Sequence, residues 1–98
     1  MNDRFPQVDI VATGWKIKMI MDAKRLSVKD VQKYLKLSSP QSIYHWIEGR
    51  NMPTIDNLYA LSELFDMPID SMIVGNRRIK QSKFEIRRLL EYYKRIAS

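Results

Sequence analysis

Apolar residues recur three and four positions apart in a series of short segments, and serine, threonine, proline and glycine separate one segment from the next. This spacing places the apolar side chains of each segment on one face of an α-helix. No segment alternates apolar and polar residues for long enough to predict a β-strand. The pattern predicts an all-α chain, in which a compact five-helix domain precedes a C-terminal amphipathic helix. The expected helices are 14–24, 28–35, about 40–48, 55–65, 68–75 and about 83–97.

Residues that begin and end helices support these boundaries. Ser27 followed by Asp30 has the pattern of a capping box, and Ser82 followed by Glu85 repeats it before the last helix. Ser39 can cap the third helix, with Pro40 in its first turn. Gly49 suits the left-handed position that follows a helix end. Only about four residues, 36–39, remain between the second and third helices, and this is the length of the turn in a helix-turn-helix.

The basic residues are concentrated in two blocks. Residues 77–98 contain eight basic and two acidic residues, which accounts for the whole formal net charge of +6. Residues 11–52 contain eight basic and three acidic residues, whereas 53–75 contain four acidic residues and no basic one. Two basic blocks favour a polyanion as partner. The alternative is a soluble protein whose basic faces contact only water.

Residue types that other functions require are missing or isolated. The chain has no cysteine, one histidine and three glycines that lie far apart. This argues against disulfides, thiolate or multi-histidine metal sites and glycine-rich phosphate loops. No apolar run approaches the about 18 residues that span a membrane, and the first residues lack the apolar part of a secretory signal. We therefore expect a cytoplasmic protein that is not an enzyme and has no cofactor, metal, membrane or small-molecule partner.

The helix over about 40–48 has two contrasting sides. Its inward side is apolar and anchors it to the domain. Its outward side carries donors and acceptors that can read base edges in a major groove, rather than the Lys and Glu common on solvated helices. The expected base-reading residues are Gln41, Ser42, Tyr44 and His45. The expected core consists of Ile17, Ile20, Val31, Leu37, Ile43, Trp46, Ile47, Leu58, Leu61 and Phe65.

The stretch from Leu26 to Thr54, with the apolar positions that follow up to Phe65, resembles the XRE family of helix-turn-helix regulators, which includes the lambdoid phage repressors and Cro. The ordered pattern I-x-x-W/I-x-x-G-x-x-x-P-[ST] carries the resemblance, which covers about 13–74. Segment 38–65 is especially similar to members from Firmicutes. The resemblance implies a five-helix repressor-like domain that binds duplex DNA sequence-specifically in transcription control, as a repressor more than as an activator.

Residue by residue, the resemblance implies that the outward positions of the third helix contact bases. It also implies phosphate contacts from loop and helix-end positions, Ser39, Arg50 and Asn51, to which Lys16, Lys29 and Lys36 add positive charge. Lys36 stands where the family usually has a turn glycine. A left-handed lysine there would cost about 1 kcal/mol relative to glycine.

The C-terminal helix lies outside the resemblance and has an apolar stripe of its own. Such a helix of about 15 residues is marginal alone in water, so its stripe must be buried, either on the domain or on a second chain. We expect a homodimer formed through Ile86, Leu89, Leu90, Tyr93 and Ile96. The expected organisation is an N-terminal arm (1–12), a DNA-binding domain (13–75) and a basic extension (76–98). The alternative function is a protein-binding module on the same fold, such as an antitoxin or adaptor.

Overall fold

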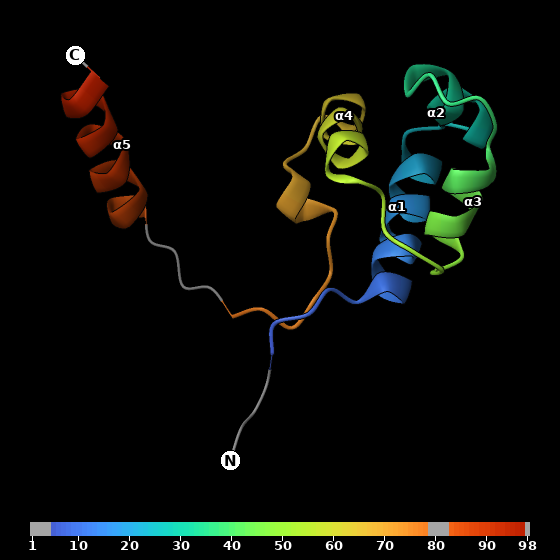
Figure 1. Ribbon diagram of the computed structural model, residues 1–98, viewed down its shortest axis with the longest axis horizontal. Coiled ribbons are helices and arrows are strands. Elements are labelled where there is room, and N and C mark those ends of the chain that lie inside the picture. The colour runs from blue at the N-terminus through green and yellow to red at the C-terminus, as the bar shows by residue number, and fades with distance from the viewer. Residues whose placement is uncertain (1–4, 79–82, 98) are drawn as a thin grey trace.

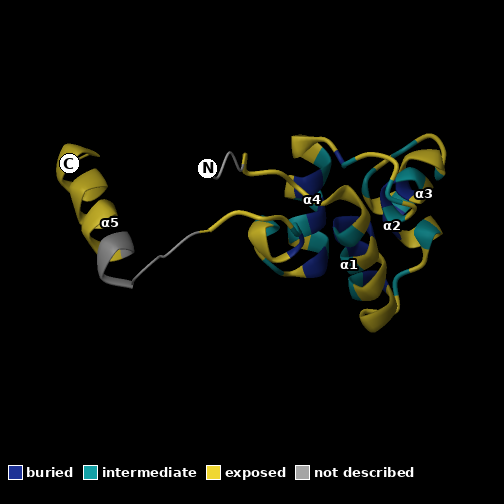
Figure 2. Ribbon diagram, turned by 90° about the horizontal axis from the view of Figure 1, so that it is seen from below, coloured by how far each residue is buried: buried dark blue, intermediate teal, exposed yellow. Residues whose placement is uncertain are grey.

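The computed structural model describes residues 5–78 and 83–97, and from the last helix it describes the side chains of residues 87–97. Its elements are α1 (Ile10–Ala23), α2 (Val28–Tyr34), α3 (Gln41–Ile47), α4 (Ile55–Phe65), the 3-10 turn η1 (Ile69–Ser71) and α5 (Lys83–Ala97). The prediction of an all-α fold is confirmed. In both views α1–α4 group into one bundle, and α5 lies apart from it (Figures 1 and 2). None of the described helices is long and apolar enough to cross a membrane.

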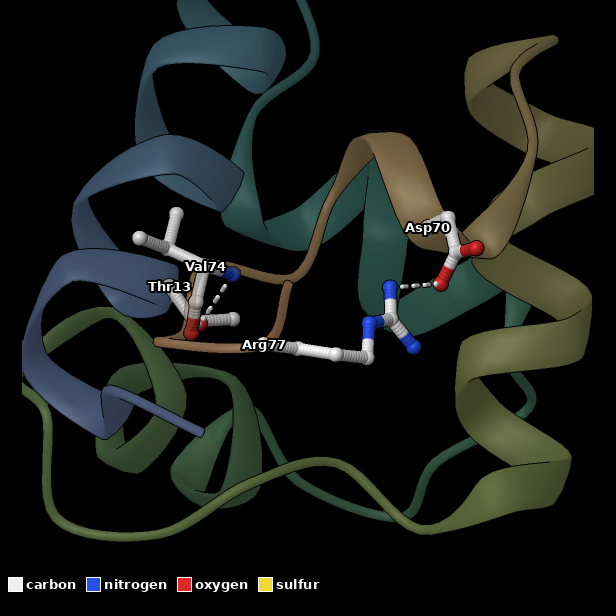
Figure 3. Close-up of polar contacts among 4 residues, drawn as sticks. All are labelled: Thr13, Asp70, Val74 and Arg77. Atoms are coloured by element: carbon white, nitrogen blue, oxygen red, sulfur yellow. Dashed lines mark hydrogen bonds and ion pairs between the residues drawn. The ribbon is translucent and has the colours of Figure 1, made fainter. Parts of the chain in front are cut away.

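Helix α1 begins earlier than the sequence pattern predicted. It starts at Ile10, and the Asp9 carboxylate caps it by accepting a hydrogen bond from the Ala12 N–H at 2.9 Å. Residues 10–12, which were expected in the N-terminal arm, therefore form the first turn. An aspartate is a better N-cap than a threonine, and Thr13 has a different partner. Its buried hydroxyl accepts from the Val74 N–H at 2.9 Å and donates to the Val74 carbonyl at 3.3 Å (Figure 3).

The fifth helix of the domain is shorter than the expected 68–75, because only Ile69–Ser71 form a 3-10 turn. The residues that follow pair with the N-terminal segment instead of extending the helix. The Asp9 N–H donates to the Val74 carbonyl at 2.7 Å and the Asn76 N–H to the Gln7 carbonyl at 3.2 Å. Val8 and Gly75 form an antiparallel bridge. This pairing joins the two ends of the domain.

Nine buried apolar side chains form one core among α1–α4 and the residue that follows η1. They are Ile17, Met21, Val31, Ile43, Trp46, Leu58, Leu61, Phe65 and Met72. Of the residues expected in the core, Ile20, Leu37 and Ile47 are half-buried and pack against this cluster. Met21, from the same apolar stripe as Ile17 and Ile20, and Met72, after η1, complete the core. Figure 2 shows the buried residues on the sides of α1 and α4 that face the neighbouring helices.

Helices α1 and α3 approach each other closely at Gly14. A Cβ added to this glycine would lie 2.2 Å from the carbonyl oxygen of Trp46 and 3.3 Å from the Cα of Ile47. Real Cβ atoms are not found at the first of these distances from backbone, so only glycine allows this packing. The glycine therefore sets how near the third helix lies to the first.

We predict that Gly14→Ala destabilises the domain, although alanine favours a helix over glycine by about 1 kcal/mol. The backbone of α3 cannot move aside as a flexible side chain would, and overpacking of this kind typically costs about 1–3 kcal/mol. Thermal unfolding followed by circular dichroism measures the effect. A melting temperature equal to or above that of the wild type would show that α1 and α3 do not approach this closely.

We also predict that Trp46→Ala strongly destabilises the domain, because Trp46 is only 4% exposed in the core. Truncating a buried tryptophan typically costs about 3–5 kcal/mol, a large part of the stability of a small domain. Chemical denaturation measures the loss. If the variant keeps its stability and loses only DNA binding, Trp46 acts in an interface and not in the core.

Candidate DNA-binding surface

The turn between α2 and α3 is built by a Schellman motif at the end of α2. The Lys36 N–H donates to the Lys33 carbonyl at 3.2 Å, and the Leu37 N–H donates to the Gln32 carbonyl at 3.0 Å. Lys36 is left-handed, with φ of 57°, as its place at the usual turn glycine implied. The Gln32 side-chain amide donates to the Leu37 carbonyl at 3.3 Å and supports the turn from α2.

The start of α2 has the predicted capping box. The Asp30 N–H donates to the Ser27 hydroxyl at 3.0 Å, and the Ser27 N–H donates to the Asp30 carboxylate at 2.8 Å. The bond from the Ser27 N–H to the Asp30 carboxylate lowers the pKa of Asp30, and the Ser27 side chain adds to this effect. Both interactions favour the ionised carboxylate. Helix α2 therefore has a well-defined beginning as well as a well-defined end.

Helix α3 begins differently from the expected Ser39 cap. Pro40 occupies the N-cap position and provides no side-chain cap. The Ser39 hydroxyl accepts only a long hydrogen bond, 3.4 Å, from the Gln41 N–H. The first hydrogen bond of the helix runs from the Tyr44 N–H to the Pro40 carbonyl at 3.2 Å, so Pro40, and not Ser39, is the residue at which the helix begins.

Gly49 ends α3 as predicted, in the left-handed conformation with φ of 74°. The Gly49 N–H donates to the Trp46 carbonyl at 3.1 Å, and the Arg50 N–H donates to the His45 carbonyl at 2.9 Å. These two bonds complete a second Schellman motif. A Cβ at Gly49 would also lie 3.0 Å from Val11 on α1, so α1 passes directly beside this turn.

The expected base-reading residues share the outward face of α3. Gln41, Ser42 and Tyr44 are exposed, and His45 is half-buried. The Gln41 side-chain amide nitrogen lies 3.4 Å from His45 Nε2, one helical turn away. The opposite face is fixed in the core by Ile43 and Trp46. The arrangement thus presents hydrogen-bonding groups on a helix whose rotation is set by its buried side.

The expected phosphate-contacting residues fall into three groups. Ser39 lies before α3, and Arg50 and Asn51 lie after it, all exposed. The Arg50 guanidinium pairs with the Glu48 carboxylate at 3.1 Å, with both side chains largely in water. Lys36 lies in the turn, and Lys29 lies in the first turn of α2.

Lys16 is the remaining phosphate candidate, and the structure places it differently. It lines a hollow on α1 together with Val74, whereas Lys18 lies with Ile47 of α3 around a second hollow. Positions 16 and 18 are on different sides of a helix, because successive residues are about 100° apart. Lys18 is therefore the α1 lysine nearer to α3, and it forms an ion pair with Asp22 at 2.6 Å.

The sequence pattern missed a second surface, the exposed apolar face of α1. Val11, Trp15 and Met19 are 58%, 68% and 63% exposed and lie four residues apart along one side of the helix. They line an open hollow of about 530 Å³ with Asp9, Ala12, Lys16 and Val74. The four-residue spacing was visible in the sequence. The expected core included only Ile17 and Ile20 from this helix, which lie outside the exposed face.

Comparison with known proteins supports the geometry of α2, the turn and α3. The model of a family described as Helix-turn-helix matches residues 17–72, more than half of the chain. The match extends from α1 to the residue after η1 and includes both helices of the motif. Neither a curated protein nor a solved structure matches the chain. The chain belongs to the helix-turn-helix family, of the XRE type, whose members bind DNA.

Proposed function

We propose that this protein binds a specific sequence of double-stranded DNA by placing α3, within the segment of about 40–48, in the major groove. The observation that supports this most directly is the outward face of α3, which is polar, nearly uncharged and exposed. A helix held at a fixed rotation can present side chains to base edges reproducibly, and this reading requires defined donors and acceptors.

Within this proposal, Gln41 reads a base directly. A glutamine at the N-terminal end of a recognition helix can form two hydrogen bonds with adenine. Ser42, Tyr44 and His45 complete the reading surface, and the contact between Gln41 and His45 limits the orientations of both side chains.

The phosphate contacts of the proposal surround this surface. Ser39, Arg50 and Asn51 lie at the two ends of α3, and Lys29 and Lys36 lie on α2 and its turn. Such contacts set the register of the protein on the duplex without reading sequence. Lys16 adds positive charge from α1.

The finer parts of the proposal rest on the resemblance to phage repressors and Cro. We propose a cytoplasmic repressor, which needs only to occupy its operator to block transcription. The greater likeness to members from Firmicutes belongs to the same proposal. We also propose the division into arm, domain and basic extension (1–12, 13–75, 76–98), in which residues 7–12 of the arm are joined to the domain by pairing and by the first turn of α1.

A second candidate function is that of a protein-binding module such as an antitoxin or adaptor. The exposed apolar face of α1, with Val11, Trp15 and Met19, favours it, because apolar side chains gathered on one surface commonly mark a protein interface. This face lies on α1, whereas the candidate reading surface lies on α3, so the two functions do not exclude each other.

Self-association through α5 is also part of the proposal. Leu89, Leu90, Tyr93 and Ile96 are each more than half exposed, and Ile86 lies outside the described side chains. An amphipathic helix of this length gains most of its stability by burying its apolar side. A dimer would bury it and would match the two-fold symmetry of paired DNA half-sites.

We predict that Gln41→Ala weakens binding to a selected DNA site by about 1–3 kcal/mol and hardly changes binding to random DNA. The site is first selected from random duplexes, and the two affinities are then measured by fluorescence anisotropy. Gln7→Ala is the matched control, because Gln7 is exposed and uses only its backbone in the hydrogen bonds described. Equal losses on both DNAs would contradict a base contact by Gln41.

We predict that removal of residues 77–98 produces a monomer and reduces the salt dependence of DNA binding. The truncation lowers the formal net charge from +6 to 0. Each phosphate that is no longer neutralised by the extension should flatten the slope of log affinity against log salt by about 0.9. Sedimentation and a salt titration measure the two effects separately. A full-length monomer on DNA with two half-sites would contradict the dimer, and an unchanged slope would contradict the phosphate contacts.

A further inference from the structure

Helix α5 has an apolar stripe with a basic flank. Leu89, Leu90, Tyr93 and Ile96 form the stripe and are exposed. With about 100° between successive residues, Arg87 and Lys94 lie together along one edge of it, whereas Arg88 and Arg95 lie along its other edge. Residues 87–97 are all exposed, as Figure 2 shows along the described part of α5.

Helix α4 has an exposed side with the opposite charge. Ile55 and Tyr59 are each 76% exposed and lie one turn apart, away from the buried Leu58, Leu61 and Phe65. Asp56 and Glu63 lie along one edge of this apolar pair and are also exposed. The surrounding segment, 53–75, has no basic residue. The Glu63 carboxylate accepts a hydrogen bond from the Tyr34 hydroxyl, which limits its movement.

The charged pairs on the two helices have the same spacing. Asp56 and Glu63 are seven residues apart, as are Arg87 and Lys94. Seven residues correspond to two helical turns, or about 10 Å along the axis. Two helices lying side by side can therefore bring both acidic groups near both basic groups at once.

With Arg87 and Lys94 as the contacting pair, which lie nearer to the stripe than Arg88 and Arg95, the positions of the two flanks determine the relative direction of the helices. Viewed from the N-terminus, the acidic pair of α4 and the basic pair of α5 lie in the same rotational direction from their apolar residues, by the 100° spacing. Charged edges that lie in the same rotational direction on two helices face each other only when the helices pack antiparallel. Antiparallel packing places Arg87 beside Glu63 and Lys94 beside Asp56.

We propose that α5 of one copy docks antiparallel on the exposed side of α4 of a second copy, through Ile55 and Tyr59 and the two charge pairs. The second copy returns the same contact, so each dimer contains it twice. This inference rests on the self-association in the proposed function and names the surface that receives α5. A second copy is the occupant because α5 lies apart from the α4 of its own chain (Figure 1).

The charge pattern distinguishes this surface from the two alternatives. The exposed apolar face of α1 has Lys16 and Lys18 on its two sides, with Asp9 near Lys16 and Asp22 paired with Lys18, so it has no edge that is acidic alone. Two α5 helices packed together antiparallel would bring their own basic flanks into contact. Like charges placed together across an interface oppose association, whereas α4 offers opposite charges.

The test uses two charge-reversed full-length variants, Asp56→Lys/Glu63→Lys and Arg87→Glu/Lys94→Glu. Each creates like charges at both contacts, so each alone should raise the dimer dissociation constant at least about tenfold. A mixture of the two variants restores opposite charges at both contacts and should form a heterodimer. Analytical ultracentrifugation without DNA measures association, and circular dichroism confirms that the exposed substitutions leave the helices folded.

Arg88→Glu/Arg95→Glu is the matched control, since it makes the same charge change with the same spacing on the other side of α5. It should associate like the wild type. Four outcomes overturn the proposal: a monomeric wild type, a dimeric Asp56→Lys/Glu63→Lys variant, a mixture that does not associate, or a control weakened as strongly as the test variants.

A dimeric α4 variant indicates α5–α5 pairing or docking on α1, and a mixture without recovery indicates docking within one chain. Because no DNA is present, failure of the DNA-binding proposal would leave these results unchanged.

Discussion

The close contact between α1 and α3 determines the presentation of the candidate reading surface. At Gly14 the two backbones approach so closely that no Cβ fits, and Trp46 and Ile43 lock the other side of α3 into the core. The rotation of α3 is therefore decided by atoms on its buried side. Gln41, Ser42 and Tyr44 are exposed as a consequence of this packing, and His45 is half-buried beside them. Sequence reading by a short helix requires such a support, because a helix of seven residues is not stable by itself.

The C-terminal ends of helices α1–α4 share one backbone motif, the Schellman motif. α1, α2, α3 and α4 are each followed by a left-handed residue, at Arg25, Lys36, Gly49 and Asp66 respectively. In each case two backbone N–H groups bond back to carbonyls of the last turn. Only one of the four positions is glycine, so the fold tolerates a local cost of about 1 kcal/mol at the others. Tertiary packing of the apolar faces offsets that cost.

The described surfaces have distinct chemistry. The outward face of α3 is polar and suits base edges. Helix α4 has an acidic and apolar side that suits α5. The exposed apolar face of α1, which includes Trp15, has no partner assigned to it. Dividing contacts among separate helices would let the proposed DNA binding and self-association occur together. In a dimer held through α4 and α5, two copies of α3 would reach DNA related by two-fold symmetry, as paired half-sites require.

The sequence by itself determined the features that depend on neighbours a few residues away. Apolar spacing predicted the helices, Ser27 and Asp30 predicted a capping box, Gly49 predicted a helix end, and the pattern around Trp46 identified the family. Tertiary structure decided what depends on distant residues. Thr13 was expected to precede α1, yet its hydroxyl bonds Val74, 61 positions away, and Asp9 caps the helix instead. The residues after Ser71 pair with the N-terminal segment and so cannot extend η1. Periodicity shows which sides of a helix are apolar, but the partners available in space decide which of those sides is buried, and Trp15 is exposed for that reason.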